Sequence, residues 1–176
     1  MQIRDAGPQD IEGILVIYND AVTRTTAIWN DATVDAENRL AWLQDRQRAG
    51  YPVLVAVTPE GRVMGYASFG DWRAFDGYRH TVEHSVYVSA EARGCGIGGL
   101  LMSALIERAR TLGKHVMVAG IEAGNAGSIR LHEKLGFRPA GELTQVGTKF
   151  GKWLDLAFMQ LTLDARQHPG DDADAP

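Results

Sequence analysis

The sequence of 176 residues has little of what marks several large protein classes. Its single cysteine, Cys95, excludes an internal disulfide, so we expect a reducing, cytoplasmic compartment. The longest weakly polar stretch, GIGGLLMSALI, is too short to span a membrane, and MQIRDAGPQD lacks the regions of a secretory signal. The 18 Lys and Arg residues are outnumbered by 22 Asp and Glu residues, which argues against a nucleic-acid partner.

Glycine, in contrast, is concentrated in one place. Residues 94–99 are GCGIGG, so four of six are glycine, and an apolar helical pattern follows at once. Each glycine costs backbone entropy on folding, so such a run is unfavourable for stability alone. The run therefore predicts that something comes so close to this backbone that side chains would obstruct it.

Length and composition predict one domain. A chain of 176 residues fits a single unit, and a hydrophobic content of 45% is enough for a substantial core. We assign residues 1–163 to this domain. The remaining segment, 164–176, is polar and acidic, and we expect it to be disordered.

The order of helical and strand patterns predicts a mixed α/β fold around one central sheet. Apolar alternation predicts strands at 2–4, 52–58, 62–69, 81–88, 115–121 and 153–162. Helical spacing and capping signals predict helices that begin at Pro8, at 35–49, at 98–112, and from Asn125 or Ser128 to Gly136. The turn at 59–61 makes strands two and three an antiparallel hairpin, whereas the β–α–β unit around the glycine run should be parallel.

One explanation of the glycine run is a dinucleotide-binding turn. Residues 94–99 match GxGxxG, and Glu122 lies near the position of the ribose-binding acid. However, residues 89–93 separate the strand from the first glycine, and strand 81–88 alternates polar and apolar residues instead of being wholly apolar. A nicotinamide-dependent oxidoreductase is therefore the weaker alternative. A Walker A loop is excluded because no Lys-Ser or Lys-Thr pair follows the glycines.

A second explanation is an anion site at the N-terminus of the helix. Unpaired backbone N–H groups and the helix dipole attract a phosphate there, and glycines let these amides surround a pyrophosphate. A third, structural explanation is a sharp strand-to-helix turn with no ligand, for which one or two glycines would be enough.

Three segments occur in a characteristic order: TVEHSVYV (81–88), ARGCGIG (92–98) and NAGSIRLHEKLGF (125–137). With the spacing Arg93-x-x-Gly96-x-Gly98, they resemble the GNAT superfamily of acyl-CoA N-acyltransferases. The branch most similar to this chain contains the phosphinothricin and methionine sulfoximine N-acetyltransferases, and the resemblance covers residues 1–163. It implies a GNAT-like mixed, largely antiparallel sheet flanked by helices, with a splayed strand pair that receives acetyl-CoA.

The same resemblance implies which residues would hold acetyl-CoA. The glycine run would bind the pyrophosphate, and the preceding strand and the next helix would bind the pantetheine arm. The residues concerned are Val86, Tyr87, Val88, Arg93, Gly94, Cys95, Gly96, Ile97, Gly98, Gly99, Asn125 and Ser128. The alternatives are core valines at the strand and an ordinary helix cap at Asn125. The sequence departs from the common pattern at Gly99, where a Ser or Thr hydroxyl often adds a phosphate contact.

Two side chains are candidates for proton transfer. Glu83 begins a strand beside a polar loop, and partial burial would raise its pKa toward neutrality, which suits a general base. The alternative is an exposed carboxylate or an ion pair with Arg79. His132 stands where relatives have a tyrosine acid and could protonate the departing CoA thiolate, although a lone helical histidine is most often structural.

The loop at 71–80 is the candidate acceptor site. Arginine forks bind a carboxylate or phosphinate, and aromatic rings would exclude water, although solvated surface arginines are the alternative. The residues predicted to bind the substrate are Trp72, Arg73, Tyr78, Arg79 and Thr81. By resemblance, the acceptor is the α-amine of a small glutamate-like amino acid: phosphinothricin, methionine sulfoximine or methionine sulfone.

We expect direct transfer in a ternary complex, because the residues flanking Cys95 supply no general base for an acyl-enzyme. We expect no metal, since His80, His84 and His115 form no metal-ligand pattern with Cys95. A homodimer is expected because the aromatic and basic stretch 147–158 could reach a neighbouring active site. Two alternatives stay open, an N-acetyltransferase for another small amine and a non-catalytic acetyl-CoA sensor.

Overall fold

The computed structural model describes residues 1–171. Within this range helices and strands alternate as a mixed α/β chain, and η1 to η3 are single turns of 3-10 helix. In chain order the elements are β1 (Gln2–Asp5), η1 (Pro8–Asp10), α1 (Ile11–Arg24), α2 (Ala36–Arg48), β2 (Val53–Val57), β3 (Val63–Asp71), η2 (Asp76–Tyr78), β4 (Thr81–Val88), η3 (Ala90–Ala92), α3 (Ile97–Thr111), β5 (Val116–Glu122), α4 (Ala126–Lys134), β6 (Arg138–Lys149) and β7 (Lys152–Thr162).

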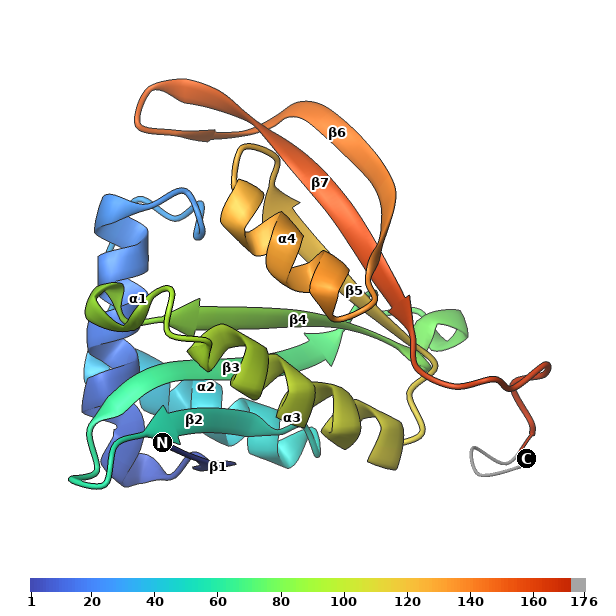
Figure 1. Ribbon diagram of the computed structural model, residues 1–176, viewed down its shortest axis with the longest axis horizontal. Helices are drawn as coiled ribbons and strands as arrows, with labels where there is room; N and C mark the ends of the chain where they lie inside the picture. The colour runs from blue at the N-terminus through green and yellow to red at the C-terminus, as the bar shows by residue number, and fades with distance from the viewer. Residues whose placement is uncertain (172–176) are drawn as a thin grey trace.

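Seven strands of the described chain form one sheet in the order β1-β2-β3-β4-β5-β7-β6. The β4–β5 pair is parallel, and the other neighbours are antiparallel. Figure 1 shows α3 and α4 on one face of this sheet and α1 and α2 on the other. The predicted hairpin and the predicted parallel unit are both confirmed.

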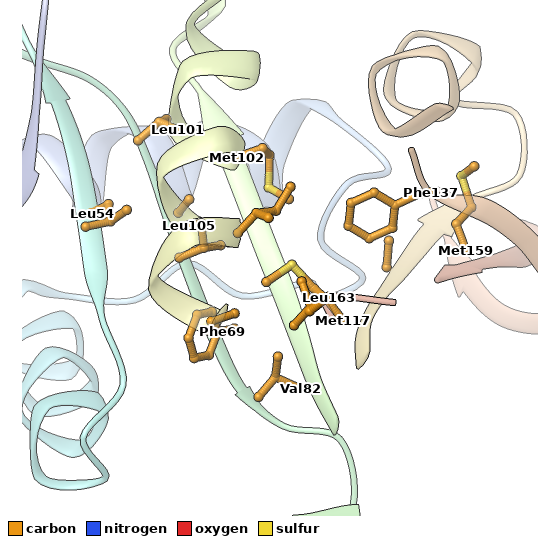
Figure 2. Close-up of a cluster of buried hydrophobic side chains, with 14 of the residues drawn as sticks. Leu54, Phe69, Val82, Leu101, Met102, Leu105, Met117, Phe137, Met159 and Leu163 are labelled. Atoms are coloured by element: carbon orange, nitrogen blue, oxygen red, sulfur yellow. The ribbon is translucent and has the colours of Figure 1, made fainter. Parts of the chain in front are cut away.

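Each face of the sheet carries its own apolar core. On the α3 side, Leu101, Met102 and Leu105 of α3 pack on the strands of the sheet. The buried strand residues there include Phe69, Val82 and Met117 (Figure 2). On the other side, α1 and α2 bury Ile14, Val22 and Leu43 against Val55 and Tyr66. Full burial of such a side chain contributes about 1.5–3 kcal/mol, so these two layers hold the sheet rigid beneath the site.

Local sequence signals fix the helix ends that matter for the site. Asn125 resolves the predicted choice of helix start, because its Oδ1 accepts the N–H of Ser128 at 3.1 Å and caps α4. The side chain of Asp35 caps α2 in the same way. Gly113, with φ of 67°, follows α3, as the sequence predicted.

Strand β6 is the main element that the sequence analysis missed. Only one terminal strand was expected there, but β6 pairs with β7 in an antiparallel hairpin at the sheet edge. Most β6 residues are exposed, and Pro139 and Gly141 interrupt the run, so no alternating apolar pattern marks it. Irregular register and a positive φ of 54° at Gln145 bend the strand further.

The segment after β7 begins with an ordered group of side chains. Asp164 contacts His115 Nδ1 at 2.7 Å and Arg166 at 2.7 Å, and Arg166 donates to the carbonyl of Gly113 at 2.9 Å. The first residues of the segment predicted to be disordered are therefore hydrogen-bonded to the domain, and its last five lie outside the described residues. Within residues 1–171, no helix combines the length and apolar composition that a bilayer-spanning segment needs.

Candidate active site

Strands β4 and β5 run together only at their beginning. Their three residue pairs are Thr81–Val116, Val82–Met117 and Glu83–Val118. Both strands continue, β4 to Val88 and β5 to Glu122, without further pairing to each other. Beyond Glu83, the backbone groups of β4 that face β5 therefore have no strand partner. This is the splayed pair that the sequence predicted.

A cleft of about 600 Å³ lies beside the splayed end of β4. The strand end, the glycine-rich turn, the first turn of α3, the start of α4 and the end of α1 surround it. Eleven of the twelve predicted cofactor residues line the cleft: Val86, Tyr87, Val88, Arg93, Gly94, Gly96, Ile97, Gly98, Gly99, Asn125 and Ser128. Cys95 is exposed and does not line it.

The glycines of the run serve two structural purposes. Gly94 and Gly96 have φ of 77° and 81°, which other residues rarely adopt, so turn geometry alone requires them. Gly98 has no positive φ, but a Cβ there would lie 3.2 Å from Leu131 Cδ2 in the cleft wall. The turn explanation therefore holds for the first two glycines, whereas at Gly98 a side chain would be crowded by Leu131.

The N-terminus of α3 offers free hydrogen-bond donors to the cleft. Leu100 is the first residue whose N–H bonds back, to Gly96 O at 3.2 Å, so the N–H groups of 97–99 have no helical partner. No side chain caps this end, and its first turn holds no acidic residue. Arg93 lines the same cleft. Free amides, a positive helix end and a guanidinium fit the pyrophosphate of a coenzyme A thioester.

A second cavity of about 330 Å³ adjoins the cleft at the point where the strands separate. Val86, Tyr87, Asn125 and Ser128 line both spaces, so the two are continuous. Glu83 lines the second cavity, opposite Gly120 and near Glu122 of β5. Two ligands can therefore lie side by side, one in each space.

Glu83 is a half-buried carboxylate. Within the described chain it makes no ion pair, so the alternative of a bridge to Arg79 is not what is found. Its Oε1 points across the sheet toward Gly120, where a Cβ would lie only 3.0 Å away. Burial raises the pKa of Glu83 above 4.5, and the positive charge of Arg73 partly opposes that rise. Glu83 thus faces the cavity, and burial makes its ionised form less stable than that of an exposed glutamate.

His132 is held in place by two partners. Its Nδ1 lies 2.7 Å from the carbonyl of Ser128, which can only accept, so Nδ1 carries the proton. Its Nε2 lies 3.0 Å from Nε2 of His84, whose ring stacks on it at 4.9 Å between centroids. Burial lowers the pKa of His132, and burial with the nearby imidazole lowers that of His84 to about 3. This geometry favours the structural role over the acid role.

The predicted acceptor residues of loop 71–80 lie beside the cavity and not in its wall. Trp72 packs edge-on against Phe158 at 5.5 Å, and the guanidinium of Arg73 covers the Trp72 ring at 4.5 Å. Tyr78 is exposed, and Arg79 donates to the carbonyl of Asp76 at 3.0 Å. Thr81 pairs with Val116 at the start of β4. Of these residues, Arg73 acts on the site through its charge near Glu83.

The sequence analysis missed one charged residue of the cavity wall. Arg46 of α2 lines the cavity that holds Glu83, although α2 carries no motif. The tip of the β6–β7 hairpin packs on the loop after α1, because Gly147 leaves room for Trp29, and Lys149 donates to the carbonyl of Ile28. Thr26 of that loop donates to Glu122 at 3.2 Å. From the sequence, Thr25, Thr26 and Trp29 of this loop were candidates to cover the acceptor pocket.

The described part of the chain has no cluster of side chains suited to bind a metal ion. Between residues 1 and 171, no three His, Cys, Asp or Glu side chains lie close enough to share an ion.

The fold and the site together define a transferase that takes an acyl group from a coenzyme A thioester: a splayed strand pair, an anion-binding helix end and a base at their junction. The chain matches the Acetyltransferase (GNAT) family over residues 14–137 and belongs to that family. It is an N-acetyltransferase with acetyl-CoA as its acetyl donor.

Known proteins similar to this chain have narrower descriptions. An L-methionine sulfoximine/L-methionine sulfone acetyltransferase of Pseudomonas aeruginosa is 64% identical over 162 residues, covering 92% of this chain and 94% of that protein. A phosphinothricin N-acetyltransferase of Streptomyces coelicolor is 34% identical, covering 93% and 96%. The structure of yncA from Salmonella typhimurium with its cofactor acetyl-CoA is 60% identical, with a TM-score of 0.93 and coverage of 96% and 97%.

Proposed function

We propose that this enzyme transfers acetyl directly from acetyl-CoA to the α-amine of a small glutamate-like amino acid. Methionine sulfoximine and methionine sulfone are the preferred acceptors, with phosphinothricin as a further substrate. The observation that carries the proposal is the Glu83 carboxylate in a cavity that is continuous with the cofactor cleft. The names of the similar enzymes support the choice of acceptor.

Glu83 acts as the general base in this proposal. An ammonium cannot attack a carbonyl, so the acceptor must first lose a proton, either to the carboxylate or to a water between them. A raised pKa makes the carboxylate a better proton acceptor than an exposed glutamate. The freed lone pair of the nitrogen then forms the new C–N bond while the C–S bond of the thioester breaks.

Backbone groups hold the acetyl donor. Acetyl-CoA supplies the acetyl group as a thioester. The free N–H groups at the start of α3 and the side chain of Arg93 would bind the pyrophosphate, and the unpaired edge of β4 beyond Glu83 would bind the pantetheine arm. The amides and the strand edge belong to the backbone, so they need little reorganisation, whereas Arg93 would exchange its contact with Asp20 at 3.3 Å for the pyrophosphate.

A ternary complex is supported by the arrangement of the two spaces. Cys95, the single thiol of the sequence, lines neither of them, so nothing suggests an acyl-enzyme at sulfur. For the proton taken up by the departing thiolate, the geometry favours solvent water over His132. That imidazole is buried, has a lowered pKa and holds its proton on the carbonyl of Ser128.

The test is a panel of amines assayed by CoA release, with mass spectrometry to place the acetyl group on the α-nitrogen. Methionine sulfoximine, methionine sulfone and phosphinothricin should all react. Glutamate has a planar head group and should be poorer by about 10²-fold, because donors made for the tetrahedral head would stay unpaired. Activity on spermidine or a peptide N-terminus with none on these acceptors would overturn the assignment. Tight acetyl-CoA binding with no turnover on any amine would favour a sensor.

We also propose a homodimer formed through the β6–β7 hairpin. Four large apolar side chains on or next to this hairpin are exposed, namely Leu143, Val146, Phe150 and Trp153. Such a concentration of apolar surface on a protruding element is typical of an interface. Light scattering at micromolar concentration tests this, and a monomer would contradict it. A cytoplasmic location stays a prediction that rests on the single free thiol.

A further inference from the structure

The side chain of Arg46 passes over Gly70 of β3 and lines the acceptor cavity, which is the space that also holds Glu83. Arg46 belongs to the last turn of α2, and its guanidinium lies over Gly70, where a Cβ would overlap Nη1. Gly70 has no positive φ, so its backbone does not require glycine. The absence of a side chain at Gly70 is therefore what lets the guanidinium lie on the sheet.

Gly70 is directly opposite Glu83 in the β3–β4 ladder. Opposed residues of an antiparallel pair point to the same face, with Cβ positions about 5 Å apart. Arg46 and Glu83 line the same cavity of about 330 Å³. A cation and a base thus lie side by side on one face, at the point where β4 and β5 separate.

The guanidinium of Arg46 has no acidic partner among residues 1–171, although it is only partly exposed. Arg48, two residues along the same helix, is exposed and pairs with Asp45. The charge of Arg73 partly opposes the rise in the pKa of Glu83. Arg46 therefore has its donors free for a ligand in the cavity.

The spacing fits the two charged groups that every α-amino acid carries on one carbon. A guanidinium fork binds a carboxylate through two parallel N–H···O bonds. An α-carboxylate held over Gly70 would leave the α-ammonium of the same molecule beside Glu83. The head group would then extend away from Gly70 into the cavity.

We infer that Arg46 binds the α-carboxylate of the acceptor and thereby selects free α-amino acids over amines that lack this group. The inference rests on the proposed function, because it concerns the same cavity. It assigns Arg46 to the carboxylate end of the substrate, with the α-ammonium beside Glu83.

The test compares methionine sulfoximine with its α-carboxamide in the wild type and in Arg46→Gln. Loss of a charge-assisted contact should raise KM for the amino acid by about 10- to 100-fold. KM for the carboxamide and KM for acetyl-CoA should stay within about twofold of the wild type. Arg48→Gln is the matched control, because it removes the same charge from the same helix outside the cavity, and it should change neither acceptor.

Gly70→Ala provides a second, independent variant. Its methyl group displaces the guanidinium but keeps the charge, so KM for the amino acid should rise in the wild-type background. In an Arg46→Gln background the same change should add little, because no guanidinium is left to displace. Thermal unfolding and acetyl-CoA binding verify that each variant is folded.

The outcomes separate this inference from the proposed function. If the wild type acetylates methionine sulfoximine but Arg46→Gln leaves its KM unchanged, or raises KM for amino acid and carboxamide alike, the role of Arg46 is wrong and the proposed function stands. If the wild type acetylates none of the glutamate-like acceptors, the proposed function fails and this inference fails with it.

Discussion

The cofactor cleft and the adjoining acceptor cavity form the donor half and the acceptor half of the site, and different chemical groups would bind the ligand in each. The donor half offers the free main-chain N–H groups at the start of α3 and the unpaired edge of β4, and the start of α4 and the end of α1 complete its walls. The acceptor half is lined by residues of α2, β4, β5 and α4 and of the loop after α1, with Arg46 and Glu83 among them. Acetyl-CoA would therefore meet main-chain amides, whereas the amino acid would meet the side chains of Arg46 and Glu83.

This difference explains how each half can change. Backbone recognition needs particular chain geometry, so it fixes glycines and helix ends and tolerates little variation. Side-chain recognition can be altered one residue at a time while the sheet beneath stays the same. A single fold can in this way keep one acetyl donor and serve different amine acceptors.

The largest effect should follow from Glu83→Gln at the junction of the two halves. Loss of a general base lowers the rate by about 10²–10⁴-fold. KM for acetyl-CoA should stay nearly unchanged, because the carboxylate lines only the acceptor cavity. Steady-state kinetics with both substrates varied measures this, and full activity would remove Glu83 from the mechanism.

The same variant should be more stable than the wild type at neutral pH. The pKa of Glu83 is raised in the folded protein, so the carboxyl group contributes stability below pH 4.5 that is lost as pH rises through the folded pKa. Gln, which stays neutral, keeps that contribution. Urea unfolding at pH 7 would contradict this if Glu83→Gln were the less stable protein.

The donor half is tested by Gly98→Val. A branched side chain at the start of α3 would occupy the mouth of the anion site, so KM for acetyl-CoA should rise by about tenfold or more, while KM for the acceptor is unchanged. Gly96 is the poorer choice, because φ of 81° would strain any replacement. Lost stability with unchanged acetyl-CoA affinity would make Gly98 a packing residue only.

The smallest effect on acetyl transfer is expected at His84, which lines the acceptor cavity with its ring stacked on that of His132. Its pKa of about 3 in the folded protein is far below 6.5, so the unfolded chain binds the extra proton first as the solution becomes acidic. Stability should therefore fall as pH decreases from 6.5 toward 3. His84→Gln, whose amide can still donate to His132, should flatten this slope and leave acetyl transfer at pH 7 nearly unchanged. If the stability of the variant depended on pH in the same way as that of the wild type, this account of the His84–His132 pair would be wrong.

What the sequence could predict follows the same division. The glycine run, Asn125 and the strand of Glu83 are contiguous patterns, and the structure brings their residues to one cleft. Arg46 could not be found, because its position depends on how α2 packs over Gly70, a contact between residues that share no local pattern. Strand β6 escaped for a related reason: its exposed residues carry no alternation, and pairing with β7 alone defines it.

The pH profile of kcat/KM for the acceptor tests the central claim most directly, because it reports the ionisation of the free enzyme. Glu83 should give the wild type an acid limb with an apparent pKa above 4.5. In Glu83→Gln that limb should vanish, leaving a low rate that no longer falls as the solution is made more acidic through this range. The same acid limb in both proteins would contradict the claim that Glu83 is the base joining the two halves of the cleft.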